Sequence, residues 1–137
     1  MYSNLFSGKK NILIVFFSSL CSLIIFTSCN KKNKVVEVDP LFSQYIDGYT
    51  SGIVSKTTAI RIKLAADAST THPIGDAVDK DPFSFSPSVK GKAIWLDART
   101  IEFKQNENLV PDKLYRVTFN LGKVTQVPAK YEEFNFN

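Results

Sequence analysis

Apolar and polar residues alternate along four short runs in the second half of the chain. The apolar positions of these runs are Phe83/Phe85, Ala93/Trp95, Ile101/Phe103 and Tyr115/Val117/Phe119. A period of two places the apolar side chains of each run on one face of a β-strand. Turn-forming residues separate the runs, at Pro87, Gly91, Asp97, Asn106, Asn108 and Pro111. Short strands with a turn about every 8–12 residues are typical of a β-sandwich.

Further strands are predicted at residues 45–54, at residues 60–64 and around Phe134 and Phe136. In the first of these segments, Gly48 and Gly52 permit a bulge or a bend. No long helical pattern follows Cys29. We therefore expect an all-β fold, an Ig-like antiparallel β-sandwich formed by residues 41–137 after an N-terminal lipoprotein signal peptide.

The alternating strands also predict which side chains form the core. We expect one buried cluster made of Ile62, Trp95, Phe103, Val117 and Phe119. Trp95 lies inside an alternating strand, which favours a core position. The alternative is a binding platform, in which an exposed Trp95 or Tyr49 stacks on a sugar or a peptide.

Two turns carry more specific signals. Asp97 opens a short segment before Thr100, and an aspartate at the first turn position accepts backbone hydrogen bonds, so a hairpin is predicted there. Farther along, Pro111 precedes a strand that begins with Tyr115. This arrangement resembles the tyrosine corner of immunoglobulin-like and fibronectin-like sandwiches, in which the hydroxyl bonds to upstream backbone. The alternative is an ordinary half-buried tyrosine.

Residues 1–28 have the pattern of an export signal. Lys9 and Lys10 precede an apolar run over residues 12–26, and small residues follow it. The run is shorter than the roughly 20 residues that cross a bilayer as a helix. A basic start, a short apolar run and small residues are typical of a signal peptide. A signal peptide without lipidation, or a membrane anchor that is never cut, remains the alternative.

The motif Phe26-Thr27-Ser28-Cys29 resembles the lipobox of bacterial lipoproteins. The resemblance implies that the chain is cleaved before Cys29 and that the Cys29 thiol is acylated. We predict a protein anchored through this lipid in the cell envelope, at the outer membrane and facing the periplasm. Residues 29–40 are expected to form a polar tether. Its lysines, Lys31, Lys32 and Lys34, are either solvated or placed against anionic lipid head groups.

Charge and cysteine content exclude several classes of function. The formal charge is +4, and Lys9 and Lys10 are the only charged residues before Cys29, so 15 of the 17 basic residues face 13 acidic ones after processing. This balance does not favour nucleic acid as a partner. The only cysteines are Cys21 and Cys29. The predicted domain therefore has no disulfide, no thiolate metal site and no cysteine nucleophile.

Chemical motifs are sparse in the rest of the chain. The loop of residues 65–82 contains the acidic residues Asp67, Asp76, Asp79 and Asp81. Such residues bind calcium in some proteins, but their spacing matches no EF-hand, and we expect them to be solvated. His72 has no cysteine or histidine partner for zinc, and we expect it to be exposed. A catalytic site would need His72 or two carboxylates in one cleft, and no serine-hydrolase or nucleotide-binding motif is present. We predict no enzyme, no metal and no cofactor.

Several short motifs follow one another in a characteristic order after residue 45. They are Tyr49-Thr50-Ser51-Gly52, Ile60-Arg61-Ile62, Phe85-Ser86-Pro87, Lys90-Gly91-Lys92, Trp95-Leu96-Asp97, Arg99-Thr100-Ile101-Glu102-Phe103 and residues 109–120. In these motifs the chain resembles the N-terminal region of bacterial alpha-2-macroglobulin family lipoproteins, and it is also similar to bacterial Ig-like domains. The resemblance implies a macroglobulin-like β-sandwich module next to a lipid anchor.

Full members of that family are large periplasmic lipoproteins that trap proteases, many of them through a Cys-x-Glu-Gln thioester. This sequence has no such motif, so trapping is not implied for it. The resemblance implies a non-catalytic, membrane-anchored module that serves as an envelope scaffold or as part of a protease-inhibitor assembly. Its partner would be another envelope protein or a protease. The alternative is an Ig-like lipoprotein that binds carbohydrate or peptide.

Overall fold

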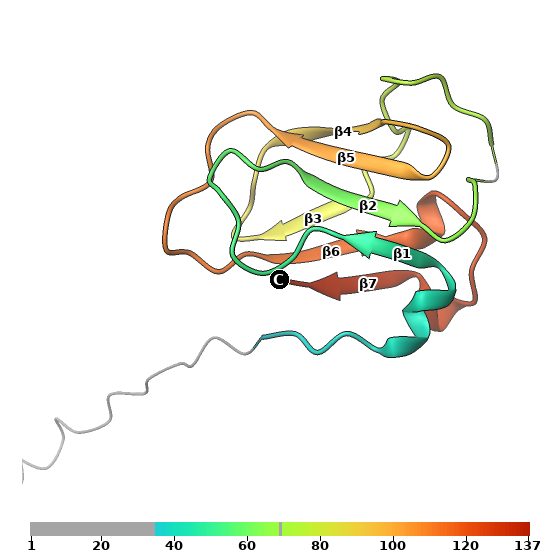
Figure 1. Cartoon of the computed structure of the whole chain (residues 1–137), viewed down its shortest axis with the longest axis horizontal. Helices are drawn as coiled ribbons and strands as arrows, with labels where there is room; N and C mark the ends of the chain where they lie inside the picture. The colour runs from blue at the N-terminus through green and yellow to red at the C-terminus, as the bar shows by residue number, and fades with distance from the viewer. Residues whose placement is uncertain (1–34, 69) are drawn as a thin grey trace, which may run out of the picture. The chain divides into compact units, whose positions relative to one another are not determined.

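The computed structural model describes residues 35–68 and 70–137, which form an all-β domain (Figure 1). The strands of these residues are β1 (Ile46–Tyr49), β2 (Ile60–Leu64), β3 (Phe83–Ser86), β4 (Gly91–Trp95), β5 (Thr100–Gln105), β6 (Arg116–Asn120) and β7 (Glu133–Phe136). The helices of the described chain are three short 3-10 helices, η1 (Pro40–Gln44), η2 (Leu121–Lys123) and η3 (Ala129–Tyr131). The predicted all-β class is therefore confirmed.

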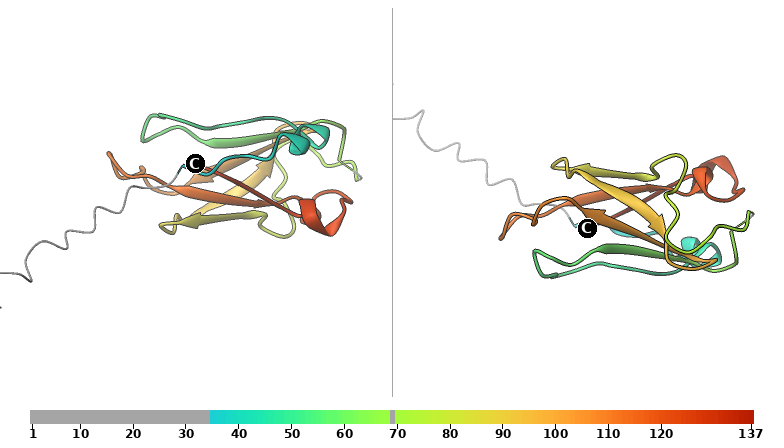
Figure 2. Two further views of the ribbon diagram at one scale, coloured as in Figure 1. Left: turned by 90° about the horizontal axis from the view of Figure 1, so that it is seen from below. Right: turned by 90° about the horizontal axis from the view of Figure 1, so that it is seen from above.

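Two antiparallel sheets form the layers of a sandwich (Figure 2). One sheet has the strand order β1-β2-β5-β4 and the other has the order β3-β6-β7. When the strands are lettered A to G along the chain, these orders become A-B-E-D and C-F-G. This is the arrangement of constant-type immunoglobulin domains. The predicted sandwich is confirmed, and its strand order is immunoglobulin-like.

The core lies between the two sheets and is rich in aromatic rings. Each of the five predicted core residues is 3% exposed or less: Ile62, Trp95, Phe103, Val117 and Phe119. Phe83 illustrates how the layers meet, because its ring centroid lies 4.9 Å from Phe119 in its own sheet and 5.4 Å from Phe103 in the other. The predicted core is therefore confirmed, and aromatic contacts join the sheets.

The first strand is shorter than the sequence predicts. β1 ends at Tyr49, and residues 50–59 form a loop instead of extending the strand. The bulge expected at Gly48 is present, because the register with β2 shifts between Ile46 and Gly48. Gly52 has a φ of +78°. This left-handed conformation, which glycine adopts at no steric cost, ends the extended path that the apolar pattern suggests.

Packing against the core begins within the segment predicted as a tether. Val38 is partly buried against the core cluster. Asp39 Oδ1 then accepts a hydrogen bond from the Leu41 backbone N–H at 2.9 Å, which caps η1. In η1, the Phe42 ring packs edge-on at 5.3 Å from Tyr131 and 5.0 Å from Phe134. The folded domain thus includes residues just before position 41.

The turn between β4 and β5 has the predicted structure. Asp97 Oδ1 accepts hydrogen bonds from the backbone N–H groups of Arg99, at 2.8 Å, and Thr100, at 2.7 Å. Leu96 N–H donates to the Thr100 carbonyl at 2.8 Å and closes the hairpin. Hydrogen bonds, first from Arg99 and then from Thr100, hold the pKa of the Asp97 carboxyl below its ordinary value of 3.8.

The substitution Trp95→Ala tests the core. It should lower the free energy of unfolding by about 3–5 kcal/mol, the usual range for removing a large buried aromatic side chain. Small domains have a total of about 5–15 kcal/mol, so the urea midpoint should fall sharply. As a control, Ile74→Ala alters a side chain that is 78% exposed and should change stability by no more than about 0.5 kcal/mol. Equal midpoints for the two variants would contradict the buried position of Trp95.

The lowered pKa of Asp97 predicts a pH dependence of stability. A carboxyl whose pKa is lower in the folded state stabilises the fold fully at pH values above its unfolded pKa, and this contribution is lost as the pH falls through the folded pKa. The variant Asp97→Asn should therefore lose less stability than the wild type when the pH falls from about 6 to about 3. Thermal unfolding at a series of pH values measures this. Asp79→Asn is the control, since the Asp79 carboxylate has no hydrogen bond within the described residues, and it should keep the wild-type profile.

Candidate functional site

Two loops far apart in the sequence meet at one end of the sandwich. Residues 50–59 connect β1 to β2, and residues 106–115 connect β5 to β6 (Figure 1). We call these two segments together the apolar loop pair. The Leu109 N–H donates to the Lys56 carbonyl at 2.9 Å, and Gln105 Nε2 donates to the Thr58 carbonyl at 3.1 Å. Hydrogen bonds to main-chain groups therefore hold the two loops in a defined arrangement.

The apolar loop pair lines an open hollow with a volume of about 630 Å³. Its lining comes from residues 52–56 of one loop and residues 109–115 of the other. Four large apolar side chains of these loops are exposed: Ile53, Val54, Val110 and Leu114. Ile53 and Val110 are the most exposed of them, Ile53 fully and Val110 by 58%. This end of the domain is therefore an apolar surface open to solvent.

Tyr115 lies between the hollow and the first residue of β6. Its Oη accepts a hydrogen bond from the Val110 backbone N–H at 3.1 Å, and the residue is half-buried. Tyr115 stands directly before β6, at the connection between strands that correspond to E and F. This is the position of the tyrosine corner in immunoglobulin domains. The predicted corner is confirmed, although the strand itself begins one residue later, at Arg116.

An unpredicted residue, Asn137, lies beside the hollow. It lines a smaller adjoining cavity of about 80 Å³, and its carbonyl accepts a hydrogen bond from Gly52 N–H at 3.4 Å. Both polar atoms of the Asn137 side chain are buried and have no hydrogen-bond partner among the described residues. Most buried polar atoms are paired, so these two are available to a further group. No local signal in the sequence marks this position, because only the tertiary structure brings Asn137 to Gly52.

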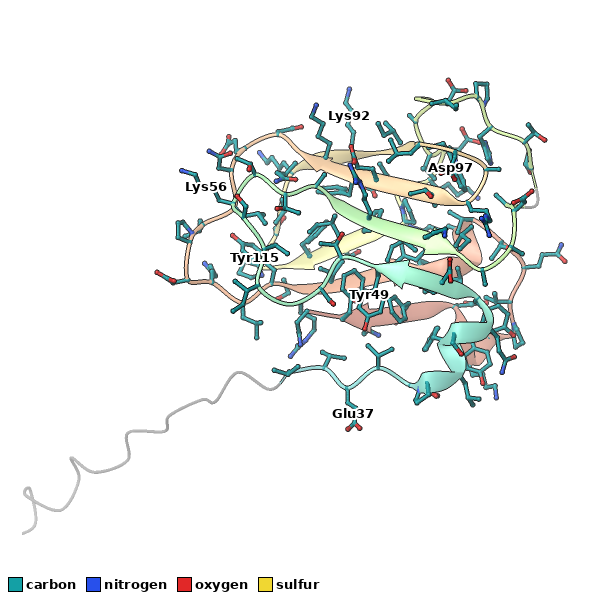
Figure 3. The ribbon with its side chains drawn as sticks, viewed as in Figure 1. Glu37, Tyr49, Lys56, Lys92, Asp97 and Tyr115 are labelled. Carbon is teal, nitrogen blue, oxygen red and sulfur yellow. The ribbon has the colours of Figure 1, made fainter. Side chains whose placement is uncertain are left out.

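Basic side chains stand beside the apolar ones. Lys56 belongs to the first loop and Lys113 to the second, and neither forms an ion pair within the part of the chain that the structure describes. Figure 3 shows Lys56 and Tyr115 at this end of the domain and Asp97 at the other. Asp112 and Glu107 are also exposed in the second loop. The end therefore presents an apolar surface with charges of both signs at its rim.

Of the two aromatic residues considered as a binding platform, Trp95 is buried and Tyr49 is partly exposed. Trp95 is 1% exposed. Tyr49 is 37% exposed, and its ring packs edge-on at 4.9 Å from Phe134 and 5.1 Å from Phe136. Trp95 therefore belongs to the core, and Tyr49 covers rings of β7.

The expectation that His72 is exposed is wrong. His72 is partly buried, and its ring stacks on Trp95 at a centroid distance of 4.4 Å and an interplanar angle of 6°. The reason is that residues 75–78 pair with the outer edge of β4. Gly75 N–H donates to the Trp95 carbonyl at 2.7 Å, and Val78 N–H donates to the Ala93 carbonyl at 3.0 Å. This pairing draws the loop across the indole ring.

The acidic side chains of this loop are dispersed. Asp81 Oδ1 accepts a hydrogen bond from the Phe83 N–H at 3.0 Å, and Asp67 lies 3.7 Å from the Arg99 guanidinium. Asp76 contributes its main-chain carbonyl, which accepts from Trp95 N–H at 2.9 Å. Within residues 35–68 and 70–137, no group of three or more histidine, cysteine or acidic side chains converges on a metal-sized space.

The predicted lipidation site, Cys29, lies outside the described residues, and so do Lys31, Lys32 and Lys34. No helix in the described part of the chain has the length and the apolar character needed to cross a membrane. No protein-family model, curated protein or solved structure matches this chain.

The hydroxyl of Tyr115 can be tested apart from its ring. Tyr115→Phe removes only the hydrogen bond to Val110 and should cost about 0.5–1.5 kcal/mol, at the lower end because water reaches the exposed Val110. Tyr115→Ala should cost several times more, because ring packing is lost as well. Urea denaturation compares the two variants. Tyr49→Phe serves as the control, since its hydroxyl has no partner within the described residues, and it should be neutral. An equally neutral Tyr115→Phe would show that the corner hydrogen bond does not stabilise the fold.

Proposed function

We propose that this protein is a non-catalytic module of the bacterial cell envelope, anchored to a membrane through an acylated Cys29. The observation that carries the proposal is the place of this cysteine. It ends a lipobox-like motif and stands nine residues before Val38, which already packs against the core. An acyl anchor at Cys29 would therefore hold the domain close to the bilayer. The proposed location is the periplasmic side of the outer membrane.

The proposed role is that of a macroglobulin-like first module. Support comes from the immunoglobulin strand order and from the tyrosine corner at Tyr115. Immunoglobulin-like sandwiches host many unrelated functions, so the family role rests on the sequence motifs and not on the fold. In this role the module would be part of an envelope scaffold or of a protease-inhibitor assembly. The partner would be another envelope protein or a protease.

A second candidate function is the binding of a peptide or a carbohydrate. The hollow of the apolar loop pair, with Tyr115 at its wall, is the site that such a ligand would use. Sugar-binding sites commonly use flat aromatic faces. Trp95 is buried and offers none, and the ring of the 37% exposed Tyr49 packs edge-on against Phe134. These positions favour the first proposal over a sugar-binding one.

The lipid anchor is tested by Cys29→Ala. In a bacterial host, the variant should accumulate as the uncut precursor and should lose incorporation of labelled palmitate, because the acylated thiol is gone. Cys21→Ala is the matched control. Cys21 lies within the predicted signal peptide, so this variant should be processed and labelled like the wild type. Palmitate labelling that persists in Cys29→Ala would reject the proposed anchor.

A further inference from the structure

The exposed apolar side chains of this domain are unevenly distributed. The described residues include eight large apolar side chains that are exposed, and four of them belong to the apolar loop pair. They gather around one hollow, whereas Leu41 and Ile74 lie elsewhere, apart from each other in the fold. Single exposed apolar residues are common, but a contiguous group usually marks an interaction surface. Among the described residues, the apolar loop pair is therefore the strongest candidate for an interaction surface.

The chain enters the domain at this same end. The segment of residues 35–39 begins near the apolar loop pair and near the end of β7, as both Figure 1 and Figure 2 show. Only five residues, 30–34, lie between Cys29 and Val35, so six residue steps connect them. Even a fully extended chain of this length reaches only roughly 20 Å. A lipid on Cys29 would thus keep this end of the sandwich within a short distance of the bilayer.

The far end is less able to reach the same bilayer. The strands of the sandwich have four to six residues each. At about 3.3 Å per residue they separate the two ends by a length similar to that of the connecting chain. The β4–β5 turn and the loop around Ile74 lie at this far end, since Gly75 pairs with the last residue of β4, Trp95. The position of the attachment therefore selects one end of the domain for contact with lipid.

The charge of the loop end is compatible with a lipid surface. The apolar loop pair contains Lys56 and Lys113 together with Glu107 and Asp112, which sum to zero. The neighbouring β3–β4 loop, whose Lys90 carbonyl accepts a hydrogen bond from the Asn106 N–H at 2.9 Å, adds Lys90. The total is then one positive charge, and Lys56 and Lys113 make no ion pair in the described structure. Lysine side chains beside apolar ones can place their ammonium groups at the head-group level while their stems remain in apolar surroundings. Anionic lipids would attract this end, and no excess of negative charge opposes them.

We propose that the apolar loop pair docks on the bilayer to which Cys29 is anchored, with Ile53 and Val110 entering the head-group region. This inference rests on the lipid anchor of the proposed function. Anchoring makes the contact intramolecular and raises its effective concentration, so even a weak apolar insertion is populated. Docking by this end would orient the domain with the apolar loop pair against the membrane. The β4–β5 turn and the loop that carries His72 then face away from the lipid, toward the partner.

Photo-crosslinking identifies the molecule that contacts the apolar loop pair. The processed full-length protein is reconstituted in vesicles of phosphatidylethanolamine and phosphatidylglycerol, with benzoylphenylalanine in place of Ile53 or, as the matched control, of Ile74. Both are exposed isoleucines, and they lie at opposite ends of the domain. Mass spectrometry should find phospholipid adducts from position 53 and none from position 74. A cross-linked dimer from position 53, a cross-link to another protein when the same variant is irradiated in cells, or equal lipid adducts from both positions would overturn the proposal.

A charge on the loop provides a second measurement. Val110→Asp alters an exposed side chain and should abolish the lipid adducts from position 53, because a carboxylate opposes entry into the head-group region. Ile74→Asp should leave them unchanged. Melting curves verify that both variants are folded. Adducts that persist in Val110→Asp would also overturn the docking.

The two proposals fail in different ways. If palmitate labels Cys29 but no lipid adduct forms at position 53, the docking is wrong and the anchor stands. If Cys29 carries no palmitate, the anchor itself is wrong, and the docking that depends on it is wrong as well.

Discussion

Contact between the aromatic inner faces of two sheets holds this domain together. Residues 30–137 contain no cysteine, so no disulfide can join the layers. In antibody domains the second cysteine of the inter-sheet disulfide stands two residues after the corner tyrosine. Here that place belongs to Val117, which is 3% exposed. The energetic contribution that a disulfide makes elsewhere must therefore come from packing, and Phe83 and Phe85, both in contact with Phe103 of the opposite sheet, supply it.

Aromatic residues also close the core at the edges of the sheets. Phe42 and Tyr131, from segments outside the sheets, close the core beside β7. On the other sheet, residues 75–78 pair with β4 and bring His72 onto Trp95. An unpaired strand edge is a site of unwanted association, and this pairing protects the edge of β4. Loops and short helices are thus part of the core and its boundary, and they are more than connections between strands.

The same packing leaves one end of the sandwich apolar and open. The loops of that end are joined by hydrogen bonds, including those from Leu109 to Lys56 and from Val110 to Tyr115. Because the sandwich is complete without Ile53, the exposure of this side chain is not required by the fold. A side chain that adds no core packing is better explained by an interaction. Under the proposed anchor at Cys29, the nearby entry of the chain would make the membrane the closest surface.

The class of the fold and most of its core follow from the pattern of residues along the chain. Alternation along residues 60–64 and 83–119 specifies strands and their buried faces, because the two sides of a strand differ by one residue. The hairpin at Asp97 and the corner at Tyr115 were also predictable, since local turn chemistry depends on neighbouring residues. The extent of β1 was not predictable in this way. The strand ends at Tyr49, and the left-handed Gly52 then turns the chain away, although the apolar pattern continues to Val54.

The tertiary structure alone decided which loops meet. Lys56 and Leu109 are far apart in the sequence, as are Gly52 and Asn137, and each pair is brought together by the order of strands in the two sheets. The stacking of His72 on Trp95 follows from pairing at a sheet edge, which no local pattern encodes. The identity of an apolar residue such as Ile53 does not show whether its side chain is buried or exposed. Its exposure, and with it the candidate site, depends on the geometry of segments that the sequence does not place side by side.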